Sequence, residues 1–171
     1  MRRAASALLL ALIGASACSS RPAATVDPFG LPLNRAILQS DLSTRPEAAL
    51  AYPGSHRVRS IGSDQIAQSG GEEADPAYRG AIYIVAAAPT DLYAWYIRWL
   101  TARHYHPVTY YRLTDQLSGI AWQVPSGREQ VQVAIYDPAR LATDPHLPTS
   151  VPTGDLVYEE LLVAYPSQTG R

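Results

Sequence analysis

The fold is decided by residues 81–104, which read AIYIVAAAPTDLYAWYIRWLTARH. Residues 81–88 are an unbroken apolar run, which predicts a strand buried on both faces in the interior of a sheet. Pro89 ends this strand, and Thr90 is placed to cap the helix that follows. The helix is predicted over about residues 91–104, because another proline comes three residues later.

The predicted helix carries more apolar surface than a single contact needs. At about 100° per residue, its apolar side chains fill an arc of roughly 200°, about twice the stripe that packs a helix on a sheet. The alternative to a second contact is that loops or N-terminal helices cover the surplus. The surplus predicts a partner surface that comprises Trp95, Tyr93, Ile97 and Trp99.

The aromatic composition favours the same interpretation. The chain has eleven Tyr and three Trp but one Phe. Tyr and Trp suit half-exposed positions, where the polar tip of the ring stays in water. We therefore expect many of these rings near the surface or at an interface.

The rest of the chain is rich in strand patterns. Residues 130–136 alternate apolar and polar side chains, as in an antiparallel strand with one buried face. One long helix cannot cover both faces of so many strands. The predicted class is therefore α+β: an antiparallel sheet of about five or six strands, with one long helix, about 91–104, packed on one face. The other predicted strands are residues 56–62, 108–113, 119–124 and 156–165.

A proline-rich connection over residues 137–155 separates the last two predicted strands. Connections of this length are uncommon in compact domains and tend to be functional or mobile. We therefore expect this loop to contribute to a binding surface or a pocket.

The N-terminus has the pattern of a signal peptide. Arg2 and Arg3 precede an apolar run over residues 4–14, which is too short to span a membrane. The sequence Ala15-Ser16-Ala17-Cys18 follows, and it resembles the lipobox of bacterial lipoproteins.

The resemblance implies cleavage before Cys18, a diacylglycerol group on its thiol, and attachment to a membrane of the cell envelope. The domain that follows is similar to small envelope lipoproteins, a similarity that implies no activity. The alternative is an ordinary signal peptidase, which cuts at the same bond after small residues and leaves Cys18 without a lipid. Both interpretations predict an exported protein.

Three segments are predicted along the chain. Residues 1–17 are the signal peptide, residues 18–45 are the lipidated cysteine and a tether with a short helix at about 34–42, and residues 46–171 are a single α+β domain. Cys18 is the one cysteine, so no internal disulfide holds this domain. Removal of the signal peptide changes the formal charge from −1 to −3, which does not favour nucleic acid as a partner.

Two groups of polar residues are candidates for metal binding or catalysis. His104 and His106 would face the same way in an extended strand, but a zinc site takes three or four ligands. Glu159 and Glu160 would point to opposite faces of a strand, whereas catalytic carboxylates converge. An edge strand with one inward charge, or a partner such as Arg112, is the expected setting for this pair. The sequence predicts no catalytic residue, no metal site and no cofactor.

Three functions fit these patterns. The first is a membrane-anchored, non-enzymatic module that binds an envelope protein or cell-wall material. The second is a small envelope hydrolase with its site between the helix and the long loop. The third is a carrier of a lipid or another apolar ligand between the helix and the sheet.

Overall fold

The computed structural model describes residues 25–28, 30–66, 74–114, 117–124, 127–137, 141, 143–145 and 147–166. Between residues 109 and 118 it describes strand backbone but no side chains. The predicted signal peptide and Cys18 lie outside the described residues, as does the side chain of Arg112.

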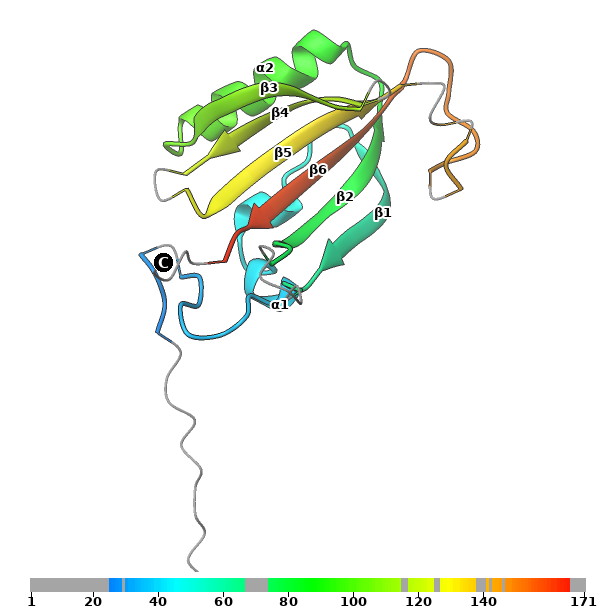
Figure 1. Cartoon of the computed structure of the whole chain (residues 1–171). Helices are drawn as coiled ribbons and strands as arrows, with labels where there is room; N and C mark the ends of the chain where they lie inside the picture. Colours follow the sequence, from blue (N-terminus) through cyan, green and yellow to red (C-terminus); the bar gives the residue numbers. More distant parts are fainter. Residues whose placement is uncertain are drawn as a thin grey trace, which may run out of the picture.

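Six antiparallel strands form one sheet in the described part of the chain, as the sequence patterns predicted (Figure 1). The strands are β1 His56–Ser63, β2 Ala77–Val85, β3 His106–Thr114, β4 Leu117–Gln123, β5 Glu129–Tyr136 and β6 Leu156–Ala164. Their order across the sheet is β1-β2-β6-β5-β4-β3. β3 to β6 form a meander, and β6 also pairs with β2. The last strand therefore joins the two parts of the sheet.

The main helix, α2, spans Pro89–Thr101. It begins two residues before the predicted start, because Pro89 occupies the first turn and Ala88 is the N-cap in place of Thr90. It ends before the predicted position at His104, where the backbone turns to a φ of 64°. Helical structure is limited in the described chain: the other helices are the four-residue α1, Gln39–Leu42, and the 3-10 helix η1, Pro46–Ala49.

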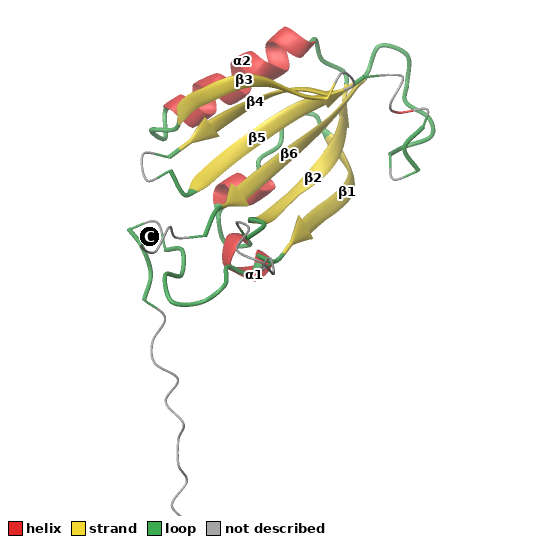
Figure 2. Cartoon of the chain, in the orientation of Figure 1, coloured by secondary structure: helices red, strands yellow, loops and turns green. Residues whose placement is uncertain are grey.

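One face of the sheet holds the main core. The Tyr96 ring on α2 lies 6.5 Å from the Trp122 ring on β4 and 6.2 Å from the Tyr158 ring on β6. Leu92 and Leu100 of α2 are fully buried in the same cluster. The two N-terminal helices lie on this side as well, near β2 and β6 (Figure 2). The helices thus bury one face of the sheet together.

Part of the predicted tether belongs to the folded domain. Leu31, Ile37 and Leu42 are fully buried in the main core, although they lie within the segment 18–45. Asp27 accepts a 2.6 Å hydrogen bond from Arg128, which ties the start of the described chain to the sheet. The predicted helix at 34–42 is reduced to α1, and the domain begins well before residue 46.

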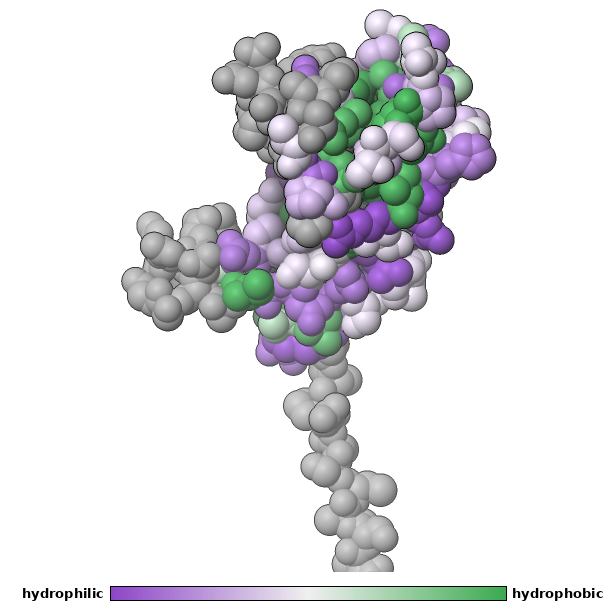
Figure 3. All heavy atoms as spheres, turned by 90° about the vertical axis from the view of Figure 1, so that its right-hand side faces the viewer, coloured by the Kyte–Doolittle hydropathy of each residue, from purple (hydrophilic) through white to green (hydrophobic). Residues whose placement is uncertain are grey.

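The connection between β5 and β6 covers the opposite face. Leu147 is buried there in a second apolar cluster, and Leu141 and Val151 pack against it. From the side on which this connection lies, apolar residues form one area bordered by a hydrophilic band (Figure 3). The described part of the loop therefore has a packing role.

Tyrosine is a core residue in this protein, which corrects the expectation that these rings lie near the surface. Five tyrosines are buried among the described residues. Tyr83 and Tyr158 stack with their ring centroids 5.2 Å apart. The Tyr158 hydroxyl accepts a 3.0 Å bond from the Tyr52 backbone N–H and lies 2.8 Å from the Ser55 hydroxyl. These bonds satisfy the polar tip that makes Tyr harder to bury than Phe.

Candidate functional site

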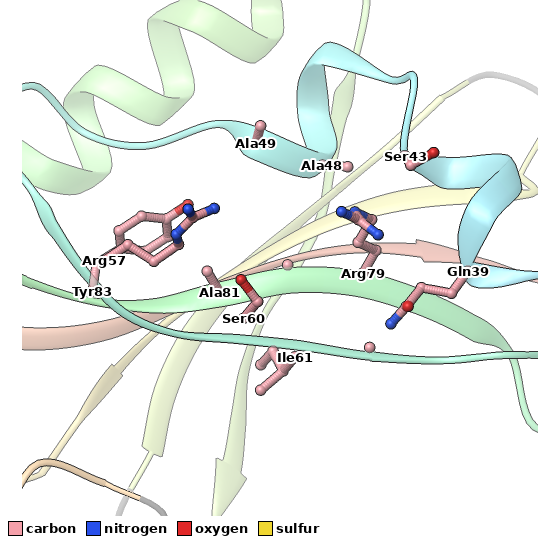
Figure 4. A pocket seen from close by; sticks show the side chains of 12 residues that line it. Gln39, Ser43, Ala48, Ala49, Arg57, Ser60, Ile61, Arg79, Ala81 and Tyr83 are labelled. Atoms are coloured by element: carbon pink, nitrogen blue, oxygen red, sulfur yellow. The ribbon is translucent and has the colours of Figure 1, made fainter.

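A pocket of about 330 Å³ lies between the N-terminal helices and strands β1 and β2 (Figure 4). It is open to solvent. Its lining combines small residues from η1 with polar and basic residues from α1 and the two strands. These residues are Gln39, Ser43, Ala48, Ala49, Arg57, Ser60, Ile61, Gly62, Arg79, Gly80, Ala81 and Tyr83.

A bulge in β1 determines which of its residues reach the pocket. Arg57 pairs with Tyr83, but the register shifts before Arg59, which pairs with Ile82. Cross-strand partners share a face of the sheet. Tyr83 belongs to the main core on the helix side and Ile82 to the cluster on the other side. The bulge therefore turns Arg57 toward the pocket and Arg59 away from it.

The pocket presents two cations, Arg57 and Arg79. Neither Arg57 nor Arg79 has a hydrogen bond or an ion pair within the described residues, and no carboxylate is among the residues that line the pocket. Burial, followed by the charge of Glu160, raises the pKa of Tyr83 to about 12, while Arg57 acts in the opposite direction. The Tyr83 hydroxyl is thus neutral at ordinary pH and able to donate a hydrogen bond.

Glu160 lies on β6, beside the strand β2 that forms part of the pocket, but it does not line the pocket. It is fully buried on β6, opposite Ala81 of β2, and neither of its oxygens has a hydrogen-bond partner in the described part of the chain. Burial, with a smaller contribution from Glu47, raises the pKa of Glu160 well above its ordinary value. Burial therefore disfavours the ionised form of this carboxyl group.

The setting of Glu160 differs from the prediction. β6 is an interior strand between β2 and β5, so the expectation of an edge strand is wrong. The two glutamates do point to opposite faces, and Glu159 accepts a hydrogen bond from the Tyr136 hydroxyl. The sequence predicted a carboxylate that points inward, but not that its oxygens would lack hydrogen-bond partners among the described residues.

A second group of buried charges lies near η1. Arg45 donates a 2.6 Å hydrogen bond to Glu129, and its side chain lies 3.8 Å from Glu47. Burial raises the pKa of Glu129 to about 7, an effect that the charge of Arg45 opposes. The Tyr105 hydroxyl is buried beside this group, and burial raises its pKa, an effect that Arg45 opposes. This group attaches the N-terminal segment to the end of β5.

The predicted partner surface on α2 is largely half-buried. Tyr93, Trp95 and Trp99 pack against the main core, whereas Ile97 is exposed over 39% of its surface. The Trp95 ring meets the Tyr52 ring edge-on at 5.8 Å, so the segment before β1 covers part of the apolar surplus.

The Arg103 guanidinium lies over the Trp99 ring, 3.5 Å from the ring centroid. An Arg over a Trp face is a stabilising contact that also keeps one side of the ring from bulk water.

The two histidines of the sequence analysis do not form one cluster. His104 lies in the turn after α2 and His106 begins β3, and both are exposed. No group of three or more His, Cys, Asp or Glu residues that could hold a metal occurs among the described residues.

Comparisons of the chain with protein-family models, with curated proteins and with solved structures find no match. In the part of the chain that the structure describes, no helix has the length and apolar character needed to cross a membrane. The fold and the pocket therefore define the molecule by themselves: a small α+β domain, mostly sheet, with a basic hollow beside its N-terminal segment.

Proposed function

We propose that this protein is an exported, lipid-anchored module of the bacterial cell envelope that acts by binding, without an enzymatic step. The observation that carries the proposal is the solvent-open pocket beside Arg57 and Arg79. Guanidinium, hydroxyl and amide groups hold a ligand by charge and hydrogen bonds. The pocket therefore supports a function in ligand recognition.

The attachment rests on the resemblance of Ala15-Ser16-Ala17-Cys18 to a lipobox. Asp27, near the start of the described chain, is bonded to Arg128, so the folded domain begins soon after the predicted anchor. A lipid on Cys18 would hold this domain at a membrane surface.

Membrane fractionation with and without Cys18 tests the attachment. The wild-type full-length chain, expressed in a bacterial host, is expected in the membrane fraction and should incorporate a labelled fatty acid. Cys18→Ala should appear in the soluble fraction without label. A wild-type chain that is soluble and unlabelled would contradict the lipid anchor and leave only the proposal that the protein is exported.

We also propose that the α2 surface formed by Tyr93, Trp95, Ile97 and Trp99 contacts an envelope protein or cell-wall material. Ile97 is the member that solvent reaches most, so Ile97→Asp is the most direct substitution. Crosslinking in membranes should recover one specific partner with the wild type and less of it with Ile97→Asp. An unchanged set of crosslinks would remove this surface from the proposal.

A small hydrolase is the second candidate, because strongly perturbed carboxyl groups such as Glu160 cluster at active sites. Glu160 does not line the pocket, however, and it is fully buried on β6 opposite Ala81. The binding function is therefore the better supported of the two.

A further inference from the structure

The two cations of the pocket stand at its opposite ends. Arg57 pairs with Tyr83, which is four residues from Arg79 along β2. At about 3.3 Å per residue, the two positions are roughly 13 Å apart. Figure 4 shows the Arg57 side chain beside Tyr83 and the Arg79 side chain toward the α1 end, with Ser60 and Ala81 between them. Each guanidinium therefore reaches the pocket from its own end.

Other groups that can donate hydrogen bonds also line the pocket. The Tyr83 and Ser60 hydroxyls and the Gln39 amide all line the pocket. Gln39 lies close over β1, because a β-carbon at Gly62 would be only 1.7 Å from its side-chain nitrogen. The backbone N–H of Gln39 also donates a 2.6 Å hydrogen bond to Asp64, which fixes the start of α1 beside the end of β1. The backbone of α1 that carries Gln39 is thus held beside β1.

The charge and the size of the pocket define a class of ligand. Two guanidinium groups give the lining a charge of +2, and no lining carboxylate offsets it. Such a site is matched by a ligand with two negative charges, and guanidinium pairs best with phosphate or carboxylate oxygens. A volume of about 330 Å³ is at the lower end for small-molecule pockets.

We infer that the pocket binds a small dianion that carries phosphate or carboxylate groups, held between Arg57 and Arg79. The inference rests on the proposed binding function and specifies its ligand. The same oxyanion chemistry has two sources: a soluble metabolite, or the phosphate of a lipid headgroup in the membrane to which the chain is attached.

Titration calorimetry on the full chain in mild detergent tests the inference. The soluble probes are inorganic phosphate and succinate, and vesicles that contain phosphatidate provide the lipid source. The variants are Arg57→Gln, Arg79→Gln and the double substitution. Because each removes one charge-assisted contact, we expect roughly a ten- to hundredfold weaker affinity for each single variant.

Arg59→Gln is the matched control. Arg59 is on the same strand and also exposed, but the bulge turns it to the other face, so its loss should change the affinity less than about twofold if binding is local. Among the residues that the structure describes, neither pocket arginine has a hydrogen bond or an ion pair, so the variants should keep the wild-type melting temperature. Arg57→Lys, which keeps the charge, should retain part of the binding.

The outcomes separate clearly. Binding of phosphate or succinate that depends on both arginines supports a soluble ligand, and binding of the vesicles alone supports a lipid headgroup. Absence of binding to all probes, or equal losses with Arg59→Gln, overturns the inference. A chain that fractionates with membranes but binds no anion would retain the anchored module and lose its ligand. Anion binding by a chain that is not acylated would retain the ligand and remove the membrane anchor from the proposal.

Discussion

Replacement of Glu160 by Gln tests the interpretation of the buried carboxyl group. In the unfolded chain its pKa is near the ordinary value of 4.5, and in the folded chain burial raises the pKa well above it. The folded state therefore binds a proton that the unfolded state has lost. This contribution to stability is complete below pH 4.5 and is lost as the pH rises through the folded-state pKa.

The size of the effect follows from the pH interval. Each pH unit in which the folded state is protonated and the unfolded state is ionised costs about 1.4 kcal/mol. Between pH 4.5 and pH 7 the loss reaches about 3 kcal/mol if Glu160 stays neutral throughout. Glu160→Gln does not titrate, so its free energy of unfolding should gain about 3 kcal/mol relative to wild type over this range.

Urea unfolding, followed by tryptophan fluorescence at several pH values from 4.5 to 7, measures this difference. Trp122 is a suitable reporter because it is buried in the main core. Glu129 also titrates in this range, but it is present in both proteins and its contribution cancels. Glu159→Gln, on the opposite face of β6, is the control and should show no gain of this size. Parallel pH profiles for wild type and Glu160→Gln would refute the reasoning.

Three other substitutions test the packing. Gly80→Ala would place a β-carbon 1.9 Å from a backbone carbonyl oxygen of β6, so we expect the free energy of unfolding to fall by about 3 kcal/mol or more. Gly62→Ala meets only the movable Gln39 side chain and should lower it by less than about 1 kcal/mol. Thermal unfolding of the two variants measures the contrast. Tyr158→Phe removes the hydroxyl that accepts the Tyr52 backbone N–H, which should lower the free energy of urea unfolding by about 1 to 2 kcal/mol, and an unchanged midpoint would show that this bond contributes nothing.

The local patterns of the sequence predicted most of the elements. The alternation at 130–136 and the apolar run at 81–88 both fall in strands, with β2 shifted toward the N-terminus. The helix was displaced by two or three residues at each end, because a proline can occupy the first helical turn and because His104 adopts a left-handed conformation. Local periodicity fixes such elements well and their ends poorly.

Properties that depend on distant residues were not predicted. β6 was expected at an edge because two adjacent glutamates interrupt it, but its neighbours in the sheet come from distant segments of the chain. The pocket requires the one-residue bulge near Arg57 and the return of the segment around Gln39 onto β1. Neither feature leaves a periodic signal in the sequence. The burial of Tyr158 depends on two groups that bond its hydroxyl, the Tyr52 backbone N–H and the Ser55 hydroxyl, which lie about a hundred residues away in the sequence.

The position of β6 has a consequence for how the chain reaches its folded state. Within the sheet, β1 and β2 are joined to the meander through this strand alone, and β2 ends at Val85 while β6 begins at Leu156. Pairing over such a separation is slow, because a long loop must close before its contacts form. A chain that crosses a membrane with its N-terminus first, as we propose, cannot complete this sheet until residues 156–164 have arrived. In such an export the sheet would stay incomplete until nearly the whole chain has crossed, and the unfinished chain could still pass through a narrow channel.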